Sequence, residues 1–294
     1  MNYTGTIWRP PYEAWSALLQ VTAGCTHHGC KFCTLYEDLP FKFRMSPMSE
    51  IDEDLRELQQ KAPNVSRVFL TGANPFVLET SKLKEIARSA RQCLPKLTSI
   101  GCFARVTDIT PKSVSELKDL RALGYNRITI GVETGDDAAL SFMNKGYTSA
   151  DILEQCHKLD EANIEYDIFY LTGIYGKGKS AEGAANTLKV FNQINPKLIG
   201  ASMLTVYPTS ELFFEIQNGR WTEETETEKY EEMKALIQGL EIRTVFAAMG
   251  ASNLLRLQGN IPDDKELLIS QIDKFIEALG EQNLRNYRTN LKHL

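Results

Sequence analysis

Residues 98–133 read TSIGCFARVTDITPKSVSELKDLRALGYNRITIGVE and contain one complete strand–helix–strand unit. The apolar and β-branched residues at both ends of the stretch are typical of buried strands. Between them, Thr110 as N-cap, Pro111 at the first helical position and Gly124 just past the end mark the start and stop of a helix. The stretch therefore predicts two parallel strands joined by a helical crossover.

The same unit recurs along the chain, because apolar strand-like runs alternate with amphipathic helical stretches. Six strands joined through helices imply a parallel sheet, and right-handed crossovers wind such a sheet into a barrel or part of one. We therefore expect an α/β fold, a partial (β/α)6 TIM-like barrel with parallel strands. The expected strands are Ser16–Thr22, Ser66–Thr71, Thr98–Phe103, Arg127–Val132, Glu165–Leu171 and Leu198–Val206.

Three parts are predicted along the chain: an N-terminal segment of residues 1–14, the barrel of residues 15–215, and a helical C-terminal extension of residues 216–294. The extension is predicted because Pro262–Leu279 places apolar residues on one helical face. The acidic run Thr222–Glu232, TEETETEKYEE, is interpreted as a solvated helix face.

Composition favours a globular protein that binds neither nucleic acid nor membranes. The 294 residues carry a net charge of −5, whereas nucleic-acid binders usually show a basic face. No apolar run approaches the ~20 residues that cross a bilayer. The first residues lack the basic and apolar regions of a signal peptide, so the expected location is the cytoplasm.

The loop after the first strand, Gly24-Cys25-Thr26-His27-His28-Gly29-Cys30-Lys31-Phe32-Cys33, brings three thiols together. Thiolates are the soft ligands of iron–sulfur clusters and zinc. The other cysteines are scattered and supply no fourth ligand nearby. An iron–sulfur cluster held by three thiolates leaves one iron open to a substrate. The alternatives are a structural zinc site completed by His27 or His28, and unliganded thiols.

With this loop in place, residues 15–215 resemble the radical S-adenosylmethionine superfamily. That family carries C-x3-C-x2-C after the first strand of a partial barrel, with an aromatic residue before the last cysteine, as Phe32 stands here. The spacing in this chain is C-x4-C-x2-C, one residue longer. The resemblance implies that Cys25, Cys30 and Cys33 hold a 4Fe–4S cluster, and that Phe32 contacts the cofactor S-adenosylmethionine.

Further cofactor contacts are implied by segments at strand ends that are similar to family motifs. Gly72, Ala73 and Asn74 follow the second strand and would contact the methionyl amino group, with Asn74 in place of the usual acid. After the fourth strand, Glu133 would bind the ribose hydroxyls, with Thr134 beside it. Two further cofactor contacts are implied: Lys145 would lie near the cofactor carboxylate, and the backbone of Ile174 would meet the adenine.

One motif indicates a different function. Gly173–Ser180 fits the phosphate-binding pattern G-x-x-x-x-G-K-[ST] after a strand and before a helix. A P-loop NTPase is therefore an alternative. It would also need an acidic residue at a later strand end to hold magnesium. The only remaining predicted strand is followed by no acid until Glu211, which disfavours this reading.

The family resemblance implies the function as well. The cluster would cleave S-adenosylmethionine reductively, and the 5′-deoxyadenosyl radical would abstract hydrogen from an unidentified small-molecule or peptide substrate, as an oxidoreductase or isomerase does. An electron donor such as flavodoxin or ferredoxin would be the partner. The sequence identifies no catalytic side chain. A zinc-stabilised barrel without catalysis is the non-enzyme alternative.

Overall fold

The computed structural model describes residues 1–291 as two compact units. The first unit comprises residues 1–28, 35–131 and 155–166, and the second comprises residues 29–34, 132–154 and the chain from residue 167 onward. Among residues 1–291, no helix combines the length and the apolar composition needed to span a bilayer.

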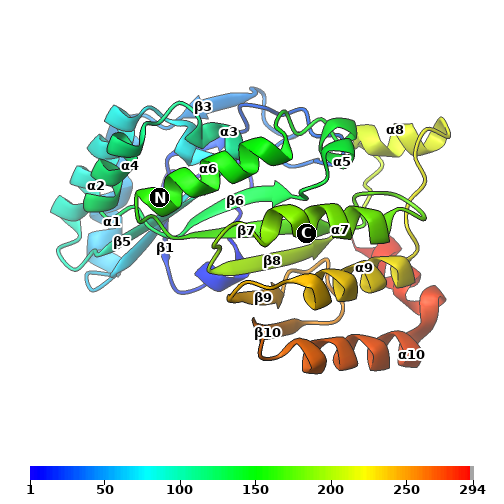
Figure 1. Ribbon diagram of the computed structural model, residues 1–294. Helices are drawn as coiled ribbons and strands as arrows, with labels where there is room; N and C mark the ends of the chain where they lie inside the picture. The colour runs from blue at the N-terminus through cyan, green and yellow to red at the C-terminus, as the bar shows by residue number, and fades with distance from the viewer. Residues whose placement is uncertain (292–294) are drawn as a thin grey trace. The chain divides into compact units, whose positions relative to one another are not determined.

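The first unit is an α/β layer built on parallel strands. β1 pairs with β4, β4 with β5, and β5 with β6, all in parallel register. Helices α1, α2 and α4 lie beside these strands (Figure 1), and α2 buries Leu83, Ile86 and Ala90 at helical spacing. The elements are β1 (Ala17–Gln20), β2 (Thr22–Gly24), β3 (Phe43–Met45), α1 (Met48–Lys61), β4 (Arg67–Thr71), α2 (Thr80–Cys93), β5 (Ser99–Ala104), α3 (Val106–Ile109), α4 (Val114–Ala122), β6 (Ile128–Glu133) and α6 (Ser149–Glu161).

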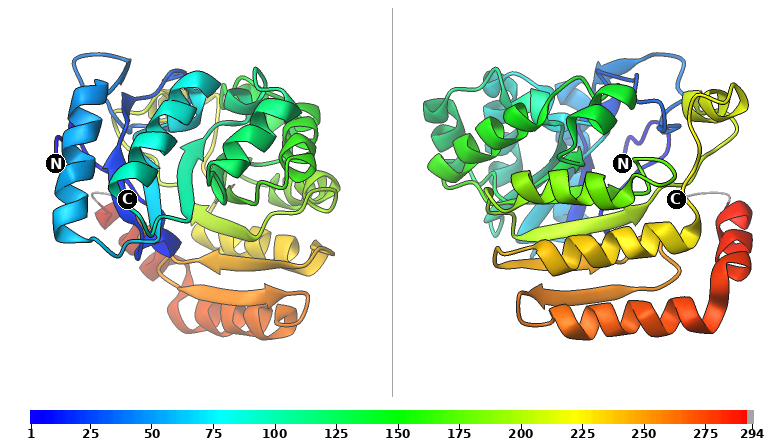
Figure 2. Two further views of the ribbon diagram at one scale, coloured as in Figure 1. Left: turned by 90° about the vertical axis from the view of Figure 1, so that its left-hand side faces the viewer. Right: turned by 45° about the vertical axis from the view of Figure 1, so that its right-hand side comes forward.

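The second unit is again an α/β layer, with parallel strands β7, β8 and β9 and an antiparallel edge strand β10. Helix α7 lies along β7 and β8, and α10 along β10 (Figure 1). Figure 2 shows that α10 bends sharply, at Gly280, whose φ of 69° is not helical. The elements are α5 (Asp137–Phe142), β7 (Tyr166–Thr172), α7 (Ser180–Phe191), β8 (Leu198–Met203), α8 (Glu211–Gln217), α9 (Glu226–Gly239), β9 (Thr244–Ala248), β10 (Leu257–Ile261) and α10 (Lys265–Asn290).

All six predicted strands are present, so the prediction of an α/β fold with parallel strands is confirmed. The C-terminal extension contains helices α9 and α10 as expected, but also the unpredicted strands β9 and β10. The alternating burial in β10 is a strand signal, although five residues are too few to stand out. The helix expected after Thr110 begins later, because Ser113 and Glu116 form a capping box. The division at residues 14 and 215 stays a prediction.

The interpretation of the acidic run as a solvated face is wrong. Glu224, Glu226 and Glu232 are each about 1% exposed. Glu226 accepts hydrogen bonds from the ammonium of Lys229 and the guanidinium of Arg288, both of which are buried as well. Buried carboxylates are tolerated when cations and hydrogen bonds compensate them, and here the cations come partly from α10, far along the chain.

Candidate functional site

The cysteine loop is divided between the units, with Cys25 in the first and Cys30 and Cys33 in the second. None of the three is in a disulfide; Cys33 is exposed and the others are half-buried. Gly24 has a φ of +77°, and a Cβ there would lie 2.2 Å from the Lys42 carbonyl oxygen, so only glycine fits before Cys25. Within residues 1–291, no three His, Cys, Asp or Glu side chains are grouped closely enough to hold a metal ion.

In the first unit, the segment after β4 contacts the start of the cysteine loop. Gly72 has a φ of +123°, and a Cβ there would lie 2.1 Å from the Thr22 hydroxyl oxygen. The neighbouring Ala73 is half-buried and Asn74 is fully buried. The Asn74 amide nitrogen donates to the Thr26 hydroxyl at 2.8 Å, and its carbonyl oxygen accepts from the Thr26 backbone N–H at 3.3 Å. The structure thus joins this strand end to the residue after Cys25.

Asp108, which sequence reasoning missed, lies behind Asn74. Its two carboxylate oxygens accept from the Asn74 amide at 3.1 Å, and one of them accepts from the Arg105 backbone N–H at 2.8 Å. Burial raises the pKa of Asp108 to about 6, although these N–H donors oppose the rise. The ammonium of Lys112 donates to the backbone carbonyl of Asp108 at 3.0 Å and holds the short helix α3 in place. The available sequence signal was an acid at the third position of a short helix that follows a strand.

In the second unit, a buried ion pair joins two of the predicted cofactor residues. The Lys145 ammonium lies 3.1 Å from a Glu133 carboxylate oxygen and 5.5 Å from the centre of the Phe32 ring. Burial favours the neutral amine, but the negative charges of Glu133, Tyr147 and Cys30 hold the pKa of Lys145 well above its ordinary range. The structure therefore brings Phe32, Glu133 and Lys145 together beside Cys30.

The backbone around this pair is fixed from both sides. Glu133 ends β6 with a φ of 65°, a left-handed conformation that side chains other than glycine rarely adopt and that often marks functional sites. The Lys31 N–H donates to the Met143 carbonyl at 3.1 Å, and Asn144 donates to the Gly29 carbonyl at 2.7 Å. The second half of the cysteine loop is thus hydrogen-bonded to the segment that carries Lys145.

Thr134 lies in a different environment. It is fully buried, and its hydroxyl is within hydrogen-bond distance of the hydroxyls of Tyr175 at 2.9 Å and Thr187 at 2.8 Å. These contacts tie the end of β6 to helix α7 and to the turn after β7. A direct contact between Thr134 and a cofactor stays a prediction.

The glycine-rich turn Gly173–Ser180 is occupied by carboxylates. The Gly173 N–H donates to Glu232 at 2.9 Å, and the Gly178 N–H donates to Glu228 at 3.2 Å. A phosphate-binding loop needs its backbone amides free to meet a phosphate, and two carboxylates in that place would repel one. The turn therefore does not serve as a P-loop, and the NTPase alternative is not supported.

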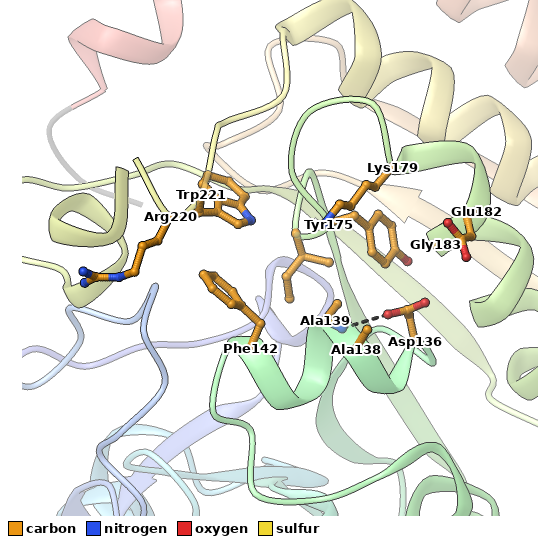
Figure 3. A pocket seen from close by; sticks show the side chains of 11 residues that line it. Asp136, Ala138, Ala139, Phe142, Tyr175, Lys179, Glu182, Gly183, Arg220 and Trp221 are labelled. Carbon is orange, nitrogen blue, oxygen red and sulfur yellow. Dashed lines mark hydrogen bonds between the residues drawn. The ribbon is translucent and has the colours of Figure 1, made fainter. Parts of the chain in front are cut away.

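Beside this turn, the second unit has a pocket of about 360 Å³. Figure 3 shows the rings of Phe142, Tyr175 and Trp221 around it, with Arg220 at one end and Lys179 at the other. Ile174, the predicted adenine contact, lines the same pocket. Ile174 also shares an apolar cluster with Phe32 of the cysteine loop. A flat, apolar group with a polar edge matches this lining.

Comparison with known proteins identifies the family of the chain. The family model "Radical SAM superfamily" matches residues 19–190. The haem chaperone HemW of Bacillus subtilis is 24% identical over 220 residues, which are 69% of this chain and 55% of that protein. The tRNA-2-methylthio-N(6)-dimethylallyladenosine synthase of Syntrophus aciditrophicus is 26% identical over 189 residues, 61% of this chain and 39% of that one. The chain thus spans about half the length, or less, of these curated relatives.

Among solved structures, the fold is similar to that of the radical S-adenosylmethionine methyltransferase TsrM of Kitasatospora setae. The version with tryptophan and a SAM analog bound has a TM-score of 0.57 at 18% identity, over 71% of this chain and 40% of that one. Another TsrM structure contains cobalamin and a [4Fe-4S] cluster. Archaeal Elp3 of Methanocaldococcus infernus has a TM-score of 0.56 at 14% identity, over 91% of this chain and 64% of that one.

Proposed function

Because the chain belongs to the radical SAM superfamily, we propose that it cleaves S-adenosylmethionine reductively and uses the radical on a small-molecule or peptide substrate. The observation that carries this proposal is the buried Lys145–Glu133 pair beside Phe32 and Cys30. It collects, in one unit, a cation, a carboxylate, an aromatic ring and a thiol. The net reaction, as oxidoreductase or isomerase, is part of the proposal.

Cys25, Cys30 and Cys33 would hold a 4Fe–4S cluster. The donor set fits in its chemistry, since these are three cysteines outside disulfides and thiolate is the ligand that such clusters prefer. When bound and reduced, the cluster supplies the electron that splits S-adenosylmethionine into methionine and a 5′-deoxyadenosyl radical.

The remaining predicted residues would bind and orient S-adenosylmethionine. Lys145 offers a cation to its carboxylate, and Glu133 offers hydrogen-bond acceptors to its ribose hydroxyls. Gly72 and Ala73 would offer backbone groups after β4 to the methionyl amino group. The pocket lined by Ile174, Phe142 and Trp221 matches the flat adenine and would exclude water from one side of it.

Two external partners belong to the proposal. An electron donor such as flavodoxin or ferredoxin would reduce the cluster. A small-molecule or peptide substrate must then supply the hydrogen atom. A reducing compartment such as the cytoplasm would keep the three cysteines as thiols and is the setting we propose.

Anaerobic reconstitution tests the cofactor assignment. We expect about four iron atoms per chain, a brown protein, and an electron paramagnetic resonance signal of the reduced cluster that changes when S-adenosylmethionine is added. Cys30→Ala should lose most of the iron, whereas Cys93→Ala, on helix α2, should load like the wild type. A colourless protein that takes up zinc instead of iron would refute the assignment.

A further inference from the structure

The first unit contains a chain of three hydrogen-bonded side chains that ends at the cysteine loop. Asp108 accepts from the amide nitrogen of Asn74, and the carbonyl oxygen of Asn74 accepts from the backbone N–H of Thr26. Thr26 directly follows Cys25 in the sequence. Asp108 and Asn74 are both buried, at 2% and 0% exposure. The chain therefore runs from the buried Asp108 on α3 to Thr26, the residue after the first predicted cluster ligand.

We propose that Asp108 is a positioning residue for the cysteine loop, because its carboxylate fixes the orientation of the Asn74 carboxamide that holds the backbone N–H of Thr26. Only the consequence for cluster binding rests on the proposed function. The hydrogen-bond chain itself exists in the protein without a cofactor.

The orientation of Asn74 matters because the two ends of a carboxamide have nearly the same shape and opposite hydrogen-bonding character. An ionised carboxylate is acceptor-only, so it requires the amide nitrogen of Asn74 on its side. The carbonyl oxygen is then directed at the N–H of Thr26, and the second amide hydrogen meets the Thr26 hydroxyl at 2.8 Å. With the carboxamide turned over, two donors would face each other at Thr26 and two acceptors at Asp108.

The position of Asp108 also explains the unusual residue at position 74. The family resemblance places an acid there, and this chain has Asn74 instead. Asp108 supplies a carboxylate one hydrogen bond behind the missing one. In this chain the acid stands on the helix after β5, with the amide of Asn74 between it and the cysteine loop.

The effect of Asp108 on the orientation of the Asn74 carboxamide depends on pH, and the charged groups around Asp108 influence that dependence. The guanidinium of Arg105 and the ammonium of Lys112 both favour the carboxylate, and the Cys102 thiol packs nearby as a neutral group. The Lys112 ammonium donates to the backbone carbonyls of Phe76 and Asp108. Burial dominates and places the pKa of Asp108 at about 6. Below this pH the carboxyl gains a proton, stops being acceptor-only and no longer dictates how Asn74 is turned.

Hydrogen exchange of the Thr26 amide in cluster-free protein tests the proposal directly. At pH 7.5 we expect Asp108→Asn to lower the protection factor of Thr26 about tenfold, which matches the loss of one hydrogen bond controlled by a charged group. In the wild type, protection should fall as the pH is lowered through about 6, and in Asp108→Asn it should not change there. Equal protection in the two proteins at pH 7.5 would overturn the proposal.

A matched control comes from the same unit. Asn126 also donates its side-chain amide to a carboxylate, that of Glu165, at 3.0 Å, but on the surface. Glu165→Gln should leave the protection of Thr26 unchanged. A loss equal to that in Asp108→Asn would show a general effect of removing an acid and would also overturn the proposal.

The exchanged pair Asn74→Asp with Asp108→Asn keeps the proposal testable if a single variant folds poorly. It places the acceptor-only group at position 74, facing the Thr26 N–H directly, and the amide behind it. We expect Thr26 protection to return to within about twofold of the wild type at pH 7.5, with no change near pH 6. A double variant as unprotected as Asp108→Asn would contradict the positioning role.

Cluster loading separates this inference from the proposed function. If Thr26 protection behaves as expected and Asp108→Asn also retains less iron than the wild type above pH 6, with the two proteins alike below it, both ideas hold. If protection behaves as expected but no variant, including the wild type, binds iron, the proposed function fails and the positioning role stands. If Thr26 protection is unchanged in Asp108→Asn and iron binding is normal, the positioning role fails and the proposed function stands.

Discussion

The two units each bury an ionisable side chain, Asp108 on helix α3 in the first and Lys145 after helix α5 in the second, and the two side chains meet different neighbours. In the first unit, Asp108 is surrounded mainly by N–H donors, those of Asn74 and Arg105. In the second unit, Lys145 lies 3.1 Å from the Glu133 carboxylate and above aromatic rings. Burial pushes both groups toward the neutral form.

The outcome differs because only one of them has a full counter-charge. The pKa of Lys145 is held well above its ordinary range, so Lys145 keeps its charge at any physiological pH. The pKa of Asp108 rises to about 6, so its charge changes close to neutral pH. The buried ion pair therefore stays charged across the physiological pH range, whereas a carboxylate among amides is suited to positioning that responds to pH.

Breaking the ion pair should have the largest effect on stability. Lys145→Met leaves the Glu133 carboxylate mostly buried without its cation, which we expect to cost about 3 kcal/mol of unfolding free energy. Urea denaturation at pH 7.5 measures it. Lys234→Met is the matched control, since Lys234 pairs with Glu231 and Asp273 at the surface and should cost less than about 1 kcal/mol. Equal losses in both variants would mean that the buried pair is not a strong anchor.

A second buried acid sharpens the comparison. Glu224 lies beside Glu232 under the Gly173–Ser180 turn, and burial raises its pKa to about 7 from an ordinary value of 4.5. A raised acid pKa adds stability that is complete below pH 4.5 and lost as the pH rises through about 7. The free energy of unfolding of Glu224→Gln, measured relative to that of the wild type, should therefore rise by about 2 kcal/mol between pH 5.5 and pH 8. A constant difference across this range would show that Glu224 keeps the same charge throughout.

The stability that Asp108 contributes should also fall as the pH rises, by a smaller amount than that of Glu224. Its pKa of about 6, against an ordinary 3.8, gives stability that is complete below pH 3.8 and lost as the pH rises through about 6. We expect Asp108→Asn to gain about 1 kcal/mol relative to the wild type between pH 5 and pH 7.5, in denaturant unfolding of both proteins. If the stability of Asp108→Asn relative to the wild type instead falls as the pH rises, the folded protein prefers the carboxylate form of Asp108 over the protonated form.

The strands and the cysteine loop could be predicted because their signals are local. Strand periodicity and the spacing of Cys25, Cys30 and Cys33 are visible within a few residues. Asp108 could not be found in this way, since its partner Asn74 lies 34 residues away and only the fold joins them. The burial of the acidic run Thr222–Glu232 could not be predicted for a related reason. Its compensating cations include Arg288, 62 residues from Glu226, and a buried and a solvated acidic helix have the same composition.

Formation of 5′-deoxyadenosine tests the central claim most directly. Reconstituted protein is mixed with dithionite and S-adenosylmethionine without oxygen, and the product is quantified by mass spectrometry beside Cys30→Ala treated identically. We expect 5′-deoxyadenosine from the wild type and none above background from the variant. Equal yields from the two proteins would contradict a radical enzyme that depends on the cysteine loop.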